Sequence, residues 1–294
     1  MATVEFRTPP RLGPSYARAL LPRRRTGGPL PGDRLVLPHA AADPRRLARY
    51  AEVCGFPAGP GGPMPATYPH VMAFPLAMAL MARRDFPHAL PGLRHIALRL
   101  EQRRPIGADE RLDLAVYASG TRPHHRGTAF DVHAEAADAS GTAVWRSVST
   151  YLAPGAPPPG TAPAPAPGGG ADETPDGGWV TDEVWDVPAA TGRRYAAVSG
   201  DRNPIHLHAL AARPFGFRRA IAHGMWTAAR CLAALAPRQP DALTLDVRFR
   251  APVMLPGRVR FLAAAGAFQL RPANTPAGGT ARPHLSGTVG APAD

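Results

Sequence analysis

The sequence of 294 residues contains no lysine, so all 34 side chains counted as lysine or arginine are arginines. Together with 37 prolines, 30 glycines and abundant alanine, this absence indicates a compositional bias of the genome. The only two cysteines, Cys54 and Cys231, fit no metal-ligand spacing, so we expect two small buried side chains. No apolar run reaches the roughly 18 residues of a membrane span, and no signal-like segment opens the chain. These absences predict a cytoplasmic protein without a membrane span.

The formal net charge of +12 would attract phosphates, but the arginines are scattered rather than arranged in a stripe. The densest run, Arg23-Arg24-Arg25, lies among prolines and glycines and has no interleaved aromatic residues that would stack on bases. Nucleic acid is therefore not the expected partner. The pair His124-His125 lies in a glycine- and arginine-rich turn without further ligands, so no metal site is predicted there.

Length and composition predict two domains joined by a linker. A chain of 294 residues exceeds the usual size of one domain, and 45% hydrophobic residues suffice for real cores. Between residues 153 and 178 the chain is rich in proline, alanine and glycine, and it buries too little apolar surface to order itself. We therefore expect an N-terminal domain over residues 1–152, a linker over 153–178 and a C-terminal domain over 179–294.

The apolar periodicity predicts an α+β fold. Helical spacing predicts helices over 44–54, 71–83 and 224–235. The second of these is apolar nearly all round, which suits burial inside a curved sheet, and Pro75 is expected within its first turn or just past it. Strand signals lie at 34–37, 94–103, 111–119, 127–136, 143–152, 179–187, 243–250, 258–268 and 284–289.

The two halves form a degenerate internal repeat. Residues 49–55 match residues 194–200 in type at five of seven positions. The parallel continues with 68–72 against 221–225, and with Arg104-Pro105-Ile106 against Ala251-Pro252-Val253. One supersecondary unit has therefore been used twice.

The stretch from Tyr195 to His206 contains the best candidates for chemistry. Asp201, Asn203 and His206 fall within six residues, after a helical run that ends at Gly200. An aspartate and a histidine five residues apart can share one water molecule, because one is a charged acceptor and the other can exist in either protonation state. Asp, Asn and Pro are also ordinary turn residues, so the spacing alone leaves open a capped turn with a surface histidine.

The first copy of the repeat lacks this pair. Phe56 stands at the position of Asp201, and Pro57-Ala58-Gly59-Pro60 follows it. Val71 stands at the position of Gly224, where its side chain would crowd a site that needs close approach to backbone N–H groups. The first half is therefore expected to be non-catalytic.

The segment Ser199-Gly200-Asp201-Arg202-Asn203-Pro204-Ile205-His206, preceded by Tyr195 and followed by Ala222-His223-Gly224-Met225, resembles the signature of the MaoC-like, or hydratase 2, family. The resemblance covers the second half of the chain closely. It implies a double hotdog, in which each half is an antiparallel sheet wrapped around a long central helix. It also implies a lyase of fatty-acid metabolism, with R-specific hydration of trans-2-enoyl thioesters and dehydration of (R)-3-hydroxyacyl thioesters.

The resemblance also implies a role for each residue of the signature. Asp201 and His206 are expected to hold and activate one water molecule, and Asn203 to orient the pair. Gly224 is expected to let the thioester carbonyl approach the free N–H groups at the start of its helix.

The neighbours of these residues have less specific roles. His223 is expected to be structural rather than catalytic, and Tyr195 and Ser199 to pack or cap the preceding helix. Three arginines near the site in sequence either contact the phosphates of coenzyme A or are solvated, namely Arg213, Arg218 and Arg219.

The remaining expectations concern ligands, assembly and alternatives. No metal and no cofactor are expected, apart from the coenzyme A or acyl carrier protein that carries the substrate. The resemblance implies that the first half accommodates the acyl chain, where Met72, Met78 and Met81 either line an adaptable tunnel or belong to the core. A monomeric double hotdog or a homodimer is expected. Two other functions stay open: an acyl-thioesterase on the same fold, and a non-enzymatic acyl-binding subunit of a dehydratase complex.

Overall fold

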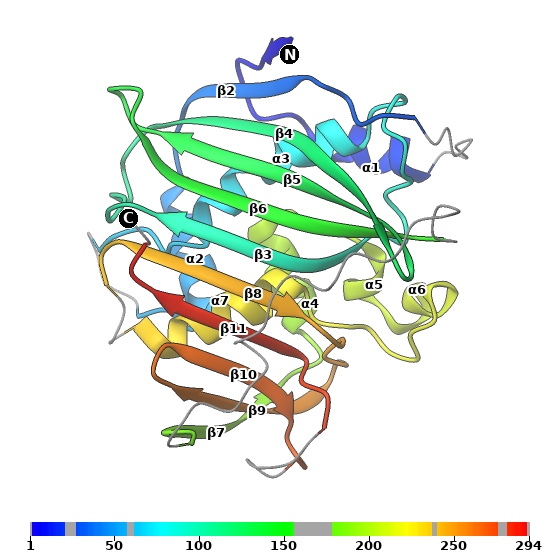
Figure 1. Ribbon diagram of the computed structural model, residues 1–294, viewed down its shortest axis with the longest axis vertical. Helices are drawn as coiled ribbons and strands as arrows, with labels where there is room; N and C mark the ends of the chain where they lie inside the picture. The colour runs from blue at the N-terminus through cyan, green and yellow to red at the C-terminus, as the bar shows by residue number, and fades with distance from the viewer. Residues whose placement is uncertain are drawn as a thin grey trace.

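One eleven-stranded sheet runs through the computed structural model, which describes residues 2–20, 28–57, 62–155, 178–236, 240–275 and 281–292. The strand order is β1-β2-β4-β5-β6-β3-β8-β11-β10-β9-β7, and the helices lie on one side of the sheet (Figure 1). The first half contributes β1 (Thr3–Glu5), β2 (Arg34–Ala40), β3 (Arg94–Gln102), β4 (Leu112–His124), β5 (Gly127–Ala137) and β6 (Ala143–Pro154). The second contributes β7 (Thr181–Val187), β8 (Leu243–Phe249), β9 (Gly257–Ala264), β10 (Ala267–Pro272) and β11 (Leu285–Gly290).

Among the described residues, three helices belong to the first half, and four helices with one 3₁₀ turn belong to the second. They are α1 (Leu12–Leu20), α2 (Pro44–Cys54), α3 (Tyr68–Met81), α4 (Thr191–Ser199), α5 (Pro204–Leu207), α6 (Ala209–Ala212), the 3₁₀ turn η1 (Arg213–Phe215) and α7 (Gly224–Leu235). Helix α3 packs against β2, β4 and β5, and α7 contacts β11. Two units, antiparallel except for the parallel pairing of β1 with β2 and each with a long central helix, are thus joined edge to edge by β3 and β8. This is the double hotdog that the resemblance implies, with one parallel pair that was not expected at its edge.

A local twofold relation connects the two halves at the centre of the sheet. Arg99 and Asp246 are equivalent in the internal repeat, because they precede the matching Arg-Pro-Ile and Ala-Pro-Val segments by the same distance. They also pair with each other across β3 and β8, and their side chains form an ion pair of 2.8 Å. The equivalent Tyr50 and Tyr195 likewise meet, with ring centroids 6.0 Å apart. Equivalent residues that face each other place the twofold axis between them.

In the part of the chain that the structure describes, one hydrophobic core spans both halves. The buried side chains of α3 and β3 that belong to it include Leu76, Leu80, Leu98 and Leu100, all with at most 1% of their surface exposed. Truncating a leucine at such a site to alanine typically costs about 2–5 kcal/mol. The core of α3 also takes up Met78 and Met81, so these methionines are packing residues and do not line the cavity described below.

The ends of α2 and α3 show how the sequence sets the helices. The Asp43 side chain accepts the N–H of Arg46 at 2.8 Å, and Gly55 ends α2 in the left-handed conformation at φ 78°. Helix α3 begins at Tyr68, three residues earlier than predicted, because Pro69 is well accommodated in a first turn. Pro75 consequently lies in the helix interior, and its predicted place near the first turn was wrong.

Other predictions on secondary structure need correction. The strand predicted over 258–268 is a hairpin of β9 and β10, because Ala265 and Gly266 adopt φ values of 48° and 80° and reverse the chain. Helix α1 and the short strand β1 were missed, because they lie before the first predicted element. The arginine run 23–25 and most of the predicted linker, residues 156–177, lie outside the described residues. Within the described ranges, no helix has the length and apolarity to cross a membrane.

Candidate active site

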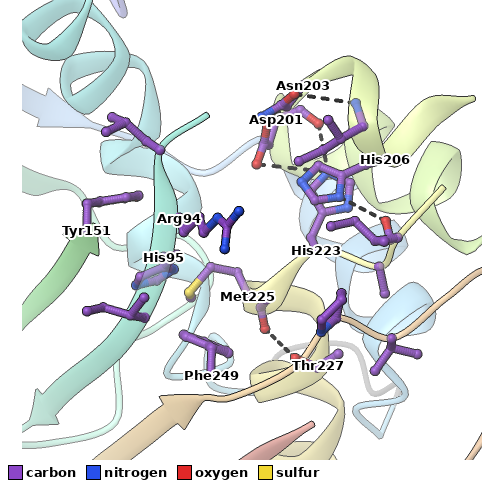
Figure 2. A pocket seen from close by; sticks show the side chains of 18 of the residues that line it. Arg94, His95, Tyr151, Asp201, Asn203, His206, His223, Met225, Thr227 and Phe249 are labelled. Atoms are coloured by element: carbon purple, nitrogen blue, oxygen red, sulfur yellow. Dashed lines mark hydrogen bonds and ion pairs between the residues drawn. The ribbon is translucent and has the colours of Figure 1, made fainter. Parts of the chain in front are cut away.

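The loop after α4 positions the first two candidate residues. Gly200 ends α4 with φ 81°, and the N–H of Asp201 then donates to Ser199 Oγ at 3.1 Å. Asn203 caps the short helix α5, since its Oδ1 accepts the N–H of Ile205 at 3.4 Å. The turn brings Asp201 and His206 to one side of a cavity (Figure 2). Asn203 therefore shapes the loop through its cap, a role that its spacing alone did not reveal.

The two oxygens of Asp201 have different surroundings. Oδ1 accepts the N–H of Asn203 at 3.1 Å, and the Tyr16 hydroxyl lies 3.4 Å away. Oδ2 lies 3.9 Å from Nε2 of His223. Burial works to raise the pKa of Asp201, but His223, His206 and these hydrogen bonds outweigh it and leave the pKa below its ordinary value. Asp201 is therefore a carboxylate at neutral pH, and the 30% of its side chain that stays accessible faces the cavity.

The tautomer of His206 follows from its hydrogen bond. Nδ1 lies 2.8 Å from the carbonyl oxygen of Ile221, which can only accept, so Nδ1 carries the proton. Burial lowers the pKa of His206, so the ring is neutral at pH 7. Its Nε2 therefore holds a free lone pair and can act as a base.

His223 is held in the opposite tautomer. Its Nε2 donates to the backbone carbonyl of Asp201 at 2.9 Å, and its ring stacks on that of His206 with centroids 3.7 Å apart. Burial, followed by the effect of His206, lowers the pKa of His223 to about 3. A ring with only 2% of its side chain exposed and no charge supports the loop of Asp201 rather than exchanging protons. Tyr195, 1% exposed, packs 4.9 Å from this ring.

The N-terminus of α7 supplies backbone donors. The first helical bond runs from the N–H of Thr227 to the carbonyl of His223, at 3.1 Å. Among the described residues, the N–H groups of Gly224, Met225 and Trp226 have no backbone acceptor. Gly224 and Met225 line the cavity, where free donors and a positive helix end can stabilise a developing negative charge.

Gly224 has a second effect on the cavity wall. A methyl group added at its Cα would lie 3.2 Å from Cε1 and 3.3 Å from Cδ1 of Phe249, and the nearest atoms all belong to this ring. The ring lies 4.7 Å from that of His95, and all three residues border the cavity. The glycine therefore makes room for Phe249 as well as for an approaching ligand.

The cavity has a volume of about 470 Å³ and is lined by both halves of the chain. Figure 2 shows Arg94, His95 and Tyr151, from β3 and β6, on the side opposite Asp201. Apolar residues of the first half also line it, among them Val71, Phe74, Leu93, Ile96 and Leu152. An apolar wall beside polar groups is the kind of surface that can bind an alkyl chain.

Several wall residues were not found from the sequence. His70 is the repeat equivalent of His223, and burial lowers its pKa to about 4. His95 and Tyr151 come from strands whose alternation gave no sign of a site. The exposed Arg218 and Arg219 do not line the cavity, and Arg219 donates to the carbonyl of Pro256 at 2.9 Å. Three other arginines do line it, namely Arg94, Arg126 and Arg250.

Phe56 occupies the position in the first half that corresponds to Asp201. Its ring stacks on that of Tyr50, with centroids 6.4 Å apart and an angle of 18° between the planes. Val71, which corresponds to Gly224, instead faces the cavity of the second half. The first half thus has no acid/base pair at this position and forms one wall of the other half's cavity.

Within the described ranges, one group of side chains could surround a metal ion, namely Asp201, His206 and His223. One possible ligand atom of each lies within 4.8 Å of the others. The donor set fits poorly, because the His223 nitrogen nearest the carboxylate already donates its proton to the Asp201 carbonyl. Binding a cation through that atom would break the bond that holds the loop. The arrangement suits acid/base chemistry better.

Comparison with known proteins gives consistent matches. The family profile described as "MaoC like domain" matches residues 174–272. The 3-hydroxyacyl-thioester dehydratase X of Mycobacterium tuberculosis is 36% identical over 262 residues, covering 88% of this chain and 90% of that protein. The crystal structure of HtdX from the same organism has a TM-score of 0.72 and 34% identity, covering 87% of this chain and 98% of that one. A MaoC-like dehydratase from Phytophthora capsici shares the fold, with a TM-score of 0.71, 17% identity and coverage of 89% and 96%.

Proposed function

This chain belongs to the family of MaoC-like dehydratases, and we propose that it catalyses the reversible dehydration of 3-hydroxyacyl thioesters to 2-enoyl thioesters. The observation that carries the proposal is one cavity in which Asp201 and His206 face the free N–H groups of α7. A carboxylate, a neutral imidazole and an oxyanion site are the groups that proton removal next to a thioester requires.

The protonation states define a route for the proton. In the dehydration direction, Nε2 of His206 takes the C2 proton, and the N–H groups of Gly224 and Met225 stabilise the thioester oxygen as it gains enolate charge. The C3–O bond then breaks, and the imidazolium returns the same proton to the departing hydroxide, which leaves as water. Oδ2 of Asp201 accepts the hydrogen bond of the 3-hydroxyl group and stabilises the imidazolium, since the two side chains lie within 4.8 Å.

This route favours one stereochemical course. Both groups belong to one loop and act from one face of the substrate, so the proton and the hydroxyl group leave from the same side. We propose syn elimination from the (R)-3-hydroxyacyl thioester, with the acyl chain against the apolar wall of the first half. The carrier is proposed to be coenzyme A or an acyl carrier protein.

The test is hydration of crotonyl- and dodecenoyl-coenzyme A, followed by the loss of enoyl-thioester absorbance. Asp201→Asn and His206→Ala are each expected to lower kcat by about 10² to 10⁴, as removal of a positioned acid/base group does. His125→Ala, an exposed histidine outside the cavity lining, serves as the matched control and should keep wild-type activity. Full activity of either site variant, or hydrolysis of saturated acyl thioesters without hydration, would contradict the proposal; the latter result would indicate a thioesterase.

A further inference from the structure

Tyr16 of α1 reaches the catalytic loop from the far end of the sequence. Its hydroxyl accepts the N–H of Arg202 at 2.6 Å, and it lies 3.1 Å from the carbonyl oxygen of Gly200 and 3.4 Å from Oδ1 of Asp201. The separation along the chain is 184 to 186 residues. A side chain of the non-catalytic half therefore contacts the turn that carries the candidate acid/base group.

The hydroxyl group can make these contacts together because it offers one proton and two acceptor positions. The N–H of Arg202 occupies one acceptor position, and the hydroxyl proton is directed to Gly200 or to Asp201. Leu12, one turn earlier in α1, packs on the same loop, since a methyl group added at Gly200 would lie 2.6 Å from its Cδ1. Two side chains of α1 thus hold the turn at Gly200 from outside.

These contacts assign separate tasks to the two carboxylate oxygens. Tyr16 and the N–H of Asn203 both lie on Oδ1, whereas Oδ2 has no hydrogen bond from the described residues and lies 3.9 Å from the His223 ring. A carboxylate fixed through one oxygen presents the other in a defined direction. Small errors in such positioning are costly, because a displacement of about 1 Å at a catalytic group can lower the rate about 10²-fold.

We propose that Tyr16 is a positioning residue for the dehydratase reaction, which holds Asp201 through Oδ1 so that Oδ2 faces the 3-hydroxyl group of the substrate. This inference rests on the proposed function. The first half of the chain then contributes to catalysis through α1, in addition to forming the wall of the cavity.

The electrostatics agree with this role. Burial, together with the charge of Asp201, raises the pKa of Tyr16 well above its usual value, so the hydroxyl keeps its proton over the whole working range. Its hydrogen bond in turn contributes to lowering the pKa of Asp201. The other titratable and charged groups around this carboxylate are Arg46 (α2), His70 (α3), Arg94 and His95 (β3), Tyr151 (β6), Tyr195 (α4), Arg202, His206 (α5) and His223.

Tyr16→Phe therefore has a specific expected signature. As the pH falls, His206 is protonated first and Asp201 at lower pH, where the acidic limb of the kcat–pH profile becomes steeper. Removing the Tyr16 hydroxyl raises the pKa of Asp201, so this steeper part of the acidic limb, meant wherever the acidic limb is compared below, should begin at higher pH. The kcat should fall about 10- to 100-fold. KM should change by less than about twofold, since Tyr16 does not line the cavity.

The experiment compares full-length wild type with Tyr16→Phe, Tyr117→Phe and Leu12→Ala on crotonyl-coenzyme A, with Tm measured for each. Tyr117→Phe is the matched control, because its hydroxyl also donates to a carboxylate, Glu135, at 3.0 Å, but outside the cavity lining. Its kcat and acidic limb should equal those of the wild type. Leu12→Ala loosens the packing of α1 but keeps the hydroxyl group, so it should lower Tm and leave the acidic limb in place.

The outcomes separate the two proposals. Suppose that the wild type is active, Asp201→Asn is inactive and the acidic limb of Tyr16→Phe is unchanged. This result overturns the role of Tyr16 and leaves the proposed function intact. A wild type without hydration activity overturns the proposed function itself. Should Tyr16→Phe not fold, Tyr16→Met, which also lacks the hydroxyl group, replaces it. An acidic limb of Tyr16→Met at higher pH than that of Leu12→Ala supports the role, and one equal to that of Leu12→Ala refutes it.

Discussion

Gly224→Ala tests whether this glycine serves the substrate, the Phe249 ring or both. The added methyl group would lie 3.2 to 3.5 Å from three atoms of that ring, so the ring must move by a few tenths of an ångström. Overpacking of this kind typically costs about 1–3 kcal/mol, and the better helix propensity of alanine returns at most about 1 kcal/mol. The net loss of stability is therefore expected to be about 0–3 kcal/mol.

The effect on activity follows from where the ring can go. Phe249 lines the cavity and lies 4.7 Å from the ring of His95, so its displacement changes the space beside the thioester. If the same 1–3 kcal/mol appears in the transition state, kcat/KM falls about 5- to 150-fold, at 1.36 kcal/mol per factor of ten. The assay is hydration of crotonyl-coenzyme A, alongside the thermal unfolding of each variant.

The double variant Gly224→Ala/Phe249→Leu distinguishes the two explanations. Leucine is smaller than phenylalanine and leaves space for the added methyl group. We expect Gly224→Ala to lower kcat/KM less in the Phe249→Leu background than in the wild-type background. If the loss is the same in both backgrounds, the methyl group obstructs the substrate itself. If Gly224→Ala has full activity, neither explanation holds.

Two further predictions follow from the states of the titratable groups. The pKa of Asp201 and that of His206 are both lowered, so the carboxylate and the neutral imidazole persist from neutral pH upwards. The kcat of the wild type should therefore stay level from about pH 7 to 9 and decline only below about pH 6.5, the ordinary pKa of histidine. A decline that begins above pH 7 would contradict the neutral state of His206. The His223 nitrogen nearest Asp201 already donates its proton to a backbone carbonyl, so we expect no metal at this site. Prolonged dialysis against EDTA should therefore leave hydration activity unchanged. Activity that is lost and restored only by an added divalent cation would contradict this expectation.

The sequence allowed prediction of features that depend on neighbouring residues or on repetition. The turn at Gly200 and the cap at Asn203 lie within one short segment, so the spacing of Asp201 and His206 was sufficient to predict a shared loop. The internal repeat predicted two equivalent units, and the pairing of β3 with β8 confirms the double hotdog. Local chemistry and repetition both leave a pattern in one sequence.

Features that depend on contacts between distant segments left no such pattern. Nothing near Tyr16 in the sequence indicates the loop that it contacts 184 residues later. His95 is one residue of an alternating strand, and only its place on β3 brings it to the cavity. The hairpin of β9 and β10 was missed because Ala265 reverses the chain at positive φ, a conformation that alanine rarely adopts.

The structure also explains why one half can lack the acid/base pair without loss of the site in the other. Trp226 of α7 corresponds in the repeat to Ala73 of α3, and its Nε1 donates to the carbonyl of Val53 at 2.9 Å, at the end of α2. The indole thus packs beside the turn where Phe56 replaces the aspartate. On the other side of the axis, Ala73 is buried in the core and its neighbour Phe74 borders the cavity. Because the first half supplies one wall of the cavity in the second half, aromatic side chains at the place that corresponds to Asp201 add apolar packing there and leave this cavity intact.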